Sequence, residues 1–254
     1  MKKVLFFIMS ALLCSCTQNM QEPLTKNVQY LKGADFFYCI KSESPATVLS
    51  WDYPVKPGME EWKQFQTNKE KTDACQIPEN ILYSLTTKEL TVICLQYPLL
   101  VSIFAFNTPD HGIDALFNEF NGIRELFKRN EASKELLSWY NCQIRNCSLL
   151  ENKDISKIEK GNFIISISTL EYLLSRATDH YMDILQNLVV GYEKKLKYSD
   201  YFDLSTNIFS RAHIINNMCK QCFDDIPEKG SLFAPFYLKE TIDIVNNLSY
   251  QLIK

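Results

Sequence analysis

The side chains in this sequence that are best suited to chemistry are thiols. Four cysteines form two close pairs, Cys142 with Cys147 and Cys219 with Cys222. Four thiolates could bind zinc, with His213 as a spare ligand, but neither pair has the aromatic or glycine knuckle of common zinc modules. A redox CxxC gains reactivity at a helix N-terminus, whereas Cys219 follows a helical run. We therefore expect structural disulfides or buried thiols here, and no metal or cofactor.

Histidine and carboxylate side chains offer a second candidate. Asp179, His180 and Asp183 have the spacing to share one face of a helix, which allows an imidazole–carboxylate hydrogen bond. This pattern is common in ordinary helices, and an ordinary surface or core histidine is the favoured interpretation. The sequence contains no GxSxG, glycine-rich phosphate loop, HExxH or calcium loop. We nominate no catalytic residue, and an enzyme is the third-ranked function.

Aromatic residues gather near the start of the polar part of the chain. Clustered aromatic rings can form a platform for a sugar or for a protein partner. They also fill the core of helical proteins, which is the interpretation that we favour. The candidate residues are Trp51, Tyr53, Trp62 and Phe65.

The first residues of the chain have the layout of a secretory signal. Lys2 and Lys3 precede the apolar stretch 4–13, which is too short for a helix to cross a bilayer. The stretch Leu13-Cys14-Ser15-Cys16 resembles the bacterial lipobox, whose last cysteine is acylated after the peptide before it is removed. The resemblance implies lipidation at Cys16 and a membrane partner reached through the lipid anchor. The alternatives are an ordinary signal peptide and an uncleaved amphiphilic stub.

This leader divides the chain into three parts. Residues 1–15 are the expected signal peptide, residues 16–26 a lipid-attached flexible tether and residues 27–254 a single helical globular domain. No acidic run follows Cys16, which favours an outer-membrane position facing the periplasm, with surface exposure as the alternative. Seven cysteines remain after Cys16, an odd number, so they cannot all pair within the chain.

The charge of the chain argues against one class of partner. Its 27 lysines and arginines are outnumbered by 30 aspartates and glutamates, for a formal net charge of −3. The basic residues are dispersed and form no cluster. Because affinity for nucleic acid depends on neutralising phosphates, we expect no nucleic-acid partner.

Helical periodicity dominates the expected domain. In residues 109–130 apolar residues recur every three or four positions, which predicts one amphipathic helix, and residues 131–141 predict a second helix packed against it as a hairpin. Thr86 and Glu89 have the spacing of a capping box. We expect two or three helices within 166–219 and a last helix over 238–253. These patterns predict an all-α fold, either an irregular bundle or a short solenoid-like array of helix pairs.

Two segments depart from this helical pattern. Residues 162–168, NFIISIS, have the composition of a strand and are the single minor β element that we allow. Residues 143–161 are polar and charged, which indicates a long connection between two helical halves. Seven glycines in 254 residues argue against a β-sandwich or barrel.

One stretch carries a family resemblance. Residues 53–62, YPVKPGMEEW, together with PENILYSLTTKELTVICLQYP and FAFNTPDHG, resemble a pattern in uncharacterised bacterial lipoproteins of the Bacteroides type. The similarity extends over residues 52–140. It implies an exported helical protein of unassigned function, with no catalytic residues to carry over.

These observations favour a cell-envelope lipoprotein that serves as a helical binding or scaffold module. The alternative is a lipoprotein that binds a small ligand or a glycan through the aromatic residues. A receptor of that kind needs a deep pocket lined by several aromatic side chains and a few polar groups.

Overall fold

The computed structural model describes residues 51–107, 109–218 and 239–254, and every regular element in them is helical, with no strand. The all-α prediction is therefore confirmed. The α-helices and the 3₁₀ helices (η) are α2 (Glu60–Gln64), α3 (Asn68–Ala74), α4 (Glu79–Leu82), α5 (Thr87–Leu95), η1 (Leu100–Ala105), α6 (Pro109–Glu119), α7 (Asn121–Leu126), α8 (Ala132–Arg145), η2 (Cys147–Glu151), α9 (Lys157–Leu174), α10 (Tyr181–Leu196), α11 (Ser205–Met218) and α13 (Lys239–Leu252).

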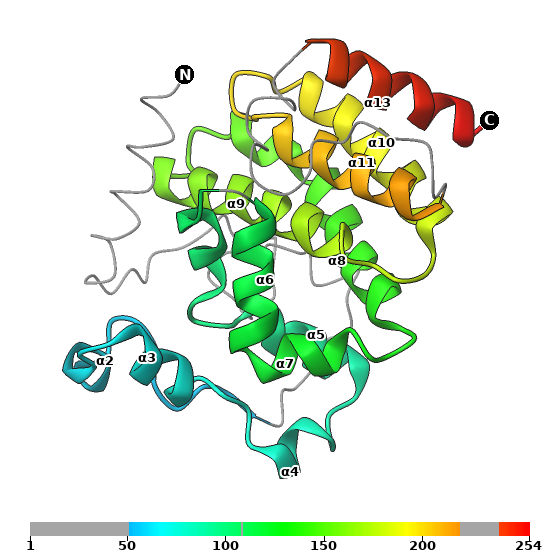
Figure 1. Ribbon diagram of the computed structural model, residues 1–254. Helices are drawn as coiled ribbons and strands as arrows, with labels where there is room; N and C mark the ends of the chain where they lie inside the picture. Colours follow the sequence, from blue (N-terminus) through cyan, green and yellow to red (C-terminus); the bar gives the residue numbers. More distant parts are fainter. Residues whose placement is uncertain (1–50, 108, 219–238) are drawn as a thin grey trace.

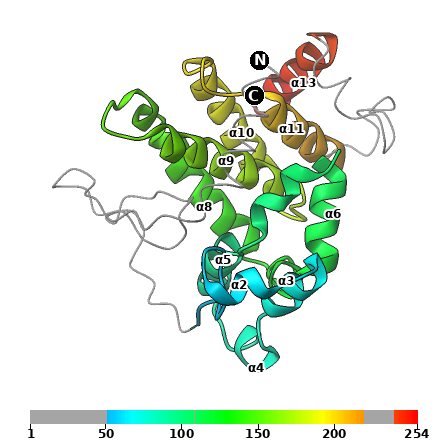
Figure 2. The same cartoon turned by 90° about the vertical axis from the view of Figure 1, so that its left-hand side faces the viewer.

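The helices form an irregular array that follows the order of the chain. Helices α2, α3 and α4 lie at one end, and α10, α11 and α13 lie at the other (Figures 1 and 2). Helix α5 packs against α7 and α8, α8 packs against α9 and α10, and α11 contacts α9, α10 and α13. Buried apolar side chains form one continuous core that runs from Tyr53 to Val245. Helices α8 to α11 therefore make up its densest part.

Short-range sequence signals set several helix starts. Thr86 and Glu89 form the predicted capping box of α5, and the same reciprocal hydrogen bonds begin α3 and α9. Glu60 and Glu61 lie in the first turn of α2, where carboxylates complement the exposed N–H groups. The start of α5 forms as expected, and each of these starts depends on residues within one turn.

The predicted helix over 109–130 is broken in the structure at Phe120, which has extended backbone angles (φ −114°, ψ 117°). The Phe120 ring stacks on Tyr97 with centroids 3.9 Å apart. Beside it, the Asn121 side chain accepts a hydrogen bond from the Ile77 N–H at 3.0 Å and donates one to the Ile77 carbonyl at 2.7 Å. These contacts to distant residues end α6 and begin α7, although the apolar periodicity continues across the break.

Three other expectations were wrong. Residues 162–168 lie within α9 and not in a strand. Most of 143–161 is helical, because α8, η2 and α9 leave only five residues, 152–156, between η2 and α9. The hairpin is also not formed, since α8 packs on α9, α10 and α5, whereas α6 packs on η1, α7 and α9. In each case local composition was compatible with more than one conformation or packing partner, and packing against distant parts of the chain determined which of them formed.

A glycine allows α10 to approach α8. A Cβ atom added to Gly191 would lie 1.8 Å from the Tyr140 hydroxyl oxygen and 2.8 Å from the ring carbon that carries it. Tyr140 is fully buried and cannot swing aside into solvent. Gly191 is therefore required by this close contact between helices.

We expect Gly191→Ala to lower the free energy of unfolding by about 1–3 kcal/mol, because overpacking outweighs the gain in helix propensity. Val190→Ala is the control, since Val190 is 57% exposed and its truncation should cost about 0.5 kcal/mol or less. Urea unfolding followed by far-ultraviolet circular dichroism measures both. Equal stability of the Gly191→Ala variant and the wild type would contradict this account.

Candidate functional site

The polar residue at the centre of the helical array is Glu171, whose side chain is fully buried. Its Oε1 accepts hydrogen bonds from the Tyr140 hydroxyl at 3.1 Å and from Asn207 Nδ2 at 2.9 Å. Its Oε2 accepts from Lys195 Nζ at 2.9 Å and from the Thr206 hydroxyl. Both carboxylate oxygens are therefore satisfied by donors from the protein itself.

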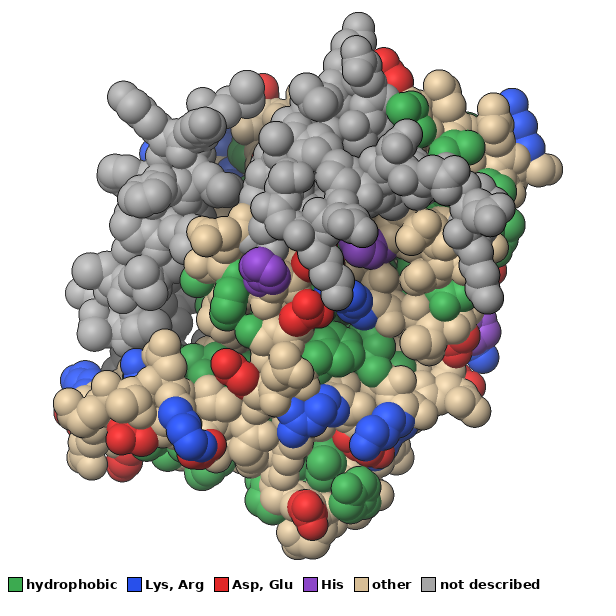
Figure 3. Space-filling view, viewed as in Figure 1, with side chains coloured by type: hydrophobic (Ala, Val, Ile, Leu, Met, Phe, Trp, Pro, Cys, Tyr) green, Lys and Arg blue, Asp and Glu red, His purple; other side chains and the backbone are tan. Residues whose placement is uncertain are grey.

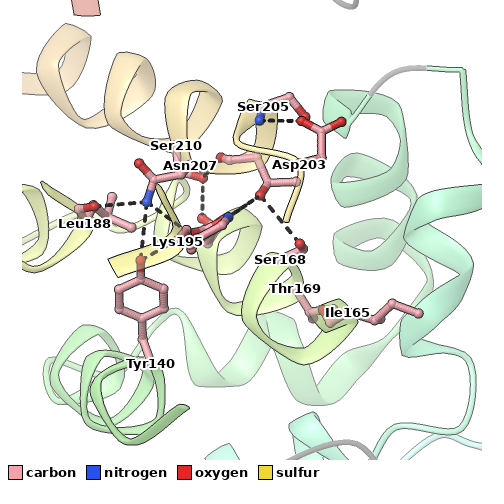
Figure 4. Close-up of polar contacts among 12 residues, drawn as sticks. Tyr140, Ile165, Ser168, Thr169, Leu188, Lys195, Asp203, Ser205, Asn207 and Ser210 are labelled. Atoms are coloured by element: carbon pink, nitrogen blue, oxygen red, sulfur yellow. Dashed lines mark hydrogen bonds and ion pairs between the residues drawn. The ribbon is translucent and has the colours of Figure 1, made fainter. Parts of the chain in front are cut away.

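Four helices supply this network, and Figure 4 shows its Tyr140, Lys195 and Asn207 side chains. Tyr140 comes from α8, Glu171 from α9, Lys195 from the last turn of α10 and the Thr206–Asn207 pair from the first turn of α11. One turn further along α11, the Ser210 hydroxyl donates to the Glu171 carbonyl at 2.6 Å. The Glu171 carboxylate and the Glu171 backbone carbonyl thus both hold α11 against α9.

The charges in this network are matched internally. Lys195 Nζ is fully buried, lies 5.3 Å from the centroid of the Phe202 ring and pairs with Glu171. Burial, followed by the neighbouring Glu171 charge, raises the pKa of Tyr140 well above its ordinary value, so Tyr140 stays protonated and acts as a donor. The network contains an amine, a carboxyl group, hydroxyls and a carboxamide, all shielded from solvent.

A second polar cluster lies nearer the surface. Arg176, just after α9, contacts Asp110 Oδ1 at 3.0 Å and Asp114 Oδ1 at 2.9 Å, both from α6. His213 of α11 lies 3.7 Å from the same oxygen of Asp110, and its ring contacts the Phe209 ring in a tilted arrangement with centroids 4.4 Å apart. Figure 3 shows histidine, acidic and basic side chains close together on one face of the molecule. The cluster joins α6 to the end of α9 and to the middle of α11.

His213 is neutral in this environment. Burial lowers its pKa and Arg176 acts in the same direction, while Asp110 and Asp114 oppose them. Its Nε2 is buried without a hydrogen-bond partner, so the imidazole has no proton acceptor in place. An imidazole next to a carboxylate resembles a general-base pair, but Arg176 already occupies the carboxylate.

The structure does not bring the predicted thiols together. Cys142 is disulfide-bonded, whereas Cys147 is a free buried thiol, so these two are not joined to each other. Cys219 and Cys222 lie outside the described residues, as does Cys16. Burial raises the pKa of the Cys147 thiol to about 12 and that of Cys75 to about 11, and buried thiols of this kind are inert.

The four candidate aromatic residues form two pairs. The rings of Trp51 and Tyr53 meet edge to face at 4.7 Å, and those of Trp62 and Phe65 do so at 5.8 Å. Tyr53 is 3% exposed and donates to the Ile93 carbonyl at 3.0 Å. Trp51 and Trp62 are partly buried against the core. Tyr53, Trp51 and Trp62 thus contribute to the core or pack against it, whereas Phe65 contacts Trp62.

We expected the histidine–carboxylate pattern around His180 to lie on one face of a helix. The structure does not place it there. His180 precedes α10 as its N-cap residue and has a left-handed backbone conformation, with φ of 51°. Its two ring nitrogens lie 3.7 Å from Asp179 and from Asp183, respectively. The arrangement is a helix start with nearby carboxylates, which requires no catalytic role.

Sequence reasoning missed Glu171 and Lys195. A signal was present, because Glu171 is the only charged residue between Lys160 and Arg176, within an otherwise apolar and uncharged run. A lone carboxylate at such a position requires a buried cation or several donors. Lys195 gave no comparable signal, since it stands in the basic stretch KKLK.

Comparison with protein-family models, with curated proteins and with solved structures finds no match for this chain. Within the described ranges, no three or more His, Cys, Asp or Glu side chains are grouped so that they could hold a metal ion. None of the helices in these ranges combines the length and the apolar character needed to cross a membrane.

We expect Lys195→Met to lower the free energy of unfolding by about 3–5 kcal/mol, because it leaves the buried Glu171 carboxylate without its cation. Lys197→Met is the matched control: Lys197 is exposed, and its loss should cost about 1 kcal/mol or less. Denaturant titration measures both. A Lys195→Met protein as stable as the control would show that the buried pair contributes no net stability.

The lowered pKa of His213 predicts a loss of stability in acid. Its folded-state pKa lies below the unfolded value, so its contribution is present above about pH 6.5 and is lost as the pH falls through the folded-state value. We expect the unfolding free energy of His213→Gln to fall less than that of the wild type over this window. Urea titrations at a series of pH values measure the difference, and parallel curves would refute the assignment.

Proposed function

We propose that this protein is a lipid-anchored helical binding or scaffold module of the bacterial cell envelope. The observation that carries the proposal is the stretch Leu13-Cys14-Ser15-Cys16, which begins at the last residue of the apolar stretch 4–13 and resembles the lipobox. Acyl chains on Cys16 would hold the protein at a membrane surface. The anchor thus needs no membrane-spanning helix in the domain.

The cysteines give independent support for export. Cys142 is disulfide-bonded, and disulfides persist mainly in oxidising compartments such as the periplasm and the cell surface. The free thiols of Cys75, Cys94 and Cys147 are buried, so they can remain reduced in such a compartment. We place the domain at the outer membrane, facing the periplasm, because the tether after Cys16 carries no acidic run.

A binding role is favoured over catalysis because the charged side chains of the two polar clusters are paired within the protein. Glu171 and Lys195 are fully buried and paired, and Arg176 is shared between two aspartates. A catalytic group needs access to a substrate. Glycan binding, the second candidate, draws little support from the aromatic residues, since Tyr53, Trp51 and Trp62 pack against the core.

The anchor is tested by paired substitutions at the two neighbouring cysteines. We expect Cys16→Ala to abolish metabolic labelling with palmitate and to move the protein out of the detergent phase, because the acylated thiol is missing. Cys14→Ala is the matched control and should label as the wild type does. Labelling that survives Cys16→Ala would overturn the anchor assignment.

The binding role is tested with the full-length acylated protein in intact cells. Chemical cross-linking followed by purification should recover a defined protein or glycan partner in near-equal amount with the wild type. The Cys16→Ala variant, which has lost the membrane position, should lose that partner if it lies in the envelope. Recovery of the monomer alone from the wild type would count against a scaffold role.

A further inference from the structure

Arg211 of α11 is a fully buried cation, and no aspartate or glutamate in the described ranges forms an ion pair with it. Its guanidinium donates to the Asn246 amide oxygen at 2.7 Å and to the Ser249 hydroxyl at 3.2 Å. It also lies 4.5 Å from the centroid of the Tyr192 ring, and its Nε is buried without a hydrogen-bond partner. Buried charges in proteins are normally paired with an opposite charge, so two neutral acceptors and a ring leave this cation poorly compensated.

Helix α13 supplies both of the neutral acceptors. It lies at the edge of the array and packs on α11 and α10 (Figure 1). Ser249 belongs to its last turn, where the unpaired carbonyl groups of a helix carry a partial negative charge. Burial nevertheless lowers the pKa of Arg211 to about 10, although Tyr192 and Tyr250 oppose the shift. The cation therefore lacks a full negative charge at the place where α13 covers it.

The attachment of α13 is slight for a helix of its length. Among its side chains from Ile242 onward, Val245 is the one apolar residue that is fully buried, whereas α10, of similar length, buries five apolar side chains. Tyr250 donates to Glu193 of α10 at 2.9 Å, but this hydrogen bond is exposed. Segments with few buried apolar contacts open at a lower free energy than the core does. We therefore expect α13 to leave its place more readily than α8 to α11.

We propose that the surface of α10 and α11 under α13 is a docking site for an amphipathic helix of a partner protein, which brings an aspartate or glutamate to Arg211 and takes the place of α13. The surface already accepts one helix, whose partly buried Ile242, Leu248 and Leu252 pack against the core. A helix with the same apolar spacing and a carboxylate at the position of Asn246 would keep these contacts and add a charged hydrogen bond to the guanidinium.

A second copy of this chain fits the site less well than such a partner. Its α13 would present the same asparagine to Arg211 and would leave the cation as poorly compensated as before. The docking site gives a partner class to the binding role proposed above and rests on that role. It does not depend on the lipid anchor at Cys16.

Synthetic peptides of residues 239–254 test the charge requirement with the full-length protein. An attached helix competes at an effective concentration of about 1 mM, so the native-sequence peptide should displace half of α13 at about 1 mM. The Asn246→Asp peptide should do so at a concentration about tenfold lower, because its carboxylate pairs with Arg211 and the two residues have similar helix propensities. The Asn247→Asp peptide is the matched control, with the same net charge at an exposed position. Hydrogen exchange of the protein's own α13 amides measures displacement, because a displaced helix loses its protection.

Equal half-displacement concentrations for the Asn246→Asp and Asn247→Asp peptides would overturn the docking site, as would a failure of the Asn246→Asp peptide to displace α13. The Arg211→Met protein should lose the tenfold preference. Arg124→Met removes an exposed arginine of α7 and should keep it. Should Arg211→Met fail to fold, the peptide comparison on the wild-type protein still decides the question.

These measurements are separate from the cross-linking of intact cells. A partner recovered there, together with no preference among the peptides, would leave the binding role in place and remove the site under α13. A tenfold preference without a recovered partner would support the docking site and count against the scaffold role in the envelope.

Discussion

The buried charge of Glu171 is the constraint on which the packing of four helices depends. A carboxylate without water is tolerated only when a cation and several donors surround it, because its desolvation costs several kcal/mol. Glu171 obtains these partners from α8, α10 and α11, while its backbone carbonyl accepts from Ser210. None of these helices can shift along α9 without breaking a hydrogen bond to a buried group. The polar network therefore fixes a register that apolar contacts alone would leave open.

Side-chain hydrogen bonds to the backbone play the same part where helices are interrupted. Asn121 pairs with both backbone groups of Ile77 beside the break at Phe120. Arg129 donates to the carbonyls of Leu82 and Leu85, at 3.1 Å and 2.6 Å, where α4 ends. A helix end leaves carbonyl groups unpaired, and the guanidinium satisfies two of them. The irregular shape of this array is thus specified by polar side chains at its breaks.

The difference between contacts within one helical turn and contacts to distant residues explains what could be predicted from the sequence. The capping box of Thr86 and Glu89 was predictable because both partners lie within one turn. The break at Phe120 was not, since it depends on Tyr97 and Ile77, which are far away in the sequence. Glu171 was visible as a lone charge in an apolar run, but its partners could not be named because Lys195 lies 24 residues away. One sequence can show that a single residue needs buried partners, whereas the identity of those partners depends on the fold.

The two polar clusters also show how the halves of the array are joined. Helix α6 belongs to the end of the molecule near α5 and α7, yet its Asp110 and Asp114 reach Arg176 at the end of α9. Arg176 in turn lies two residues beyond Leu174, where the helix that carries Glu171 ends. Helix α9 thus carries Glu171, which binds α8, α10 and α11. The same helix ends next to Arg176, which binds α6. Both attachments are ion pairs with a defined direction. They therefore fix the position of α6 relative to α8, α10 and α11 more strictly than apolar contacts could.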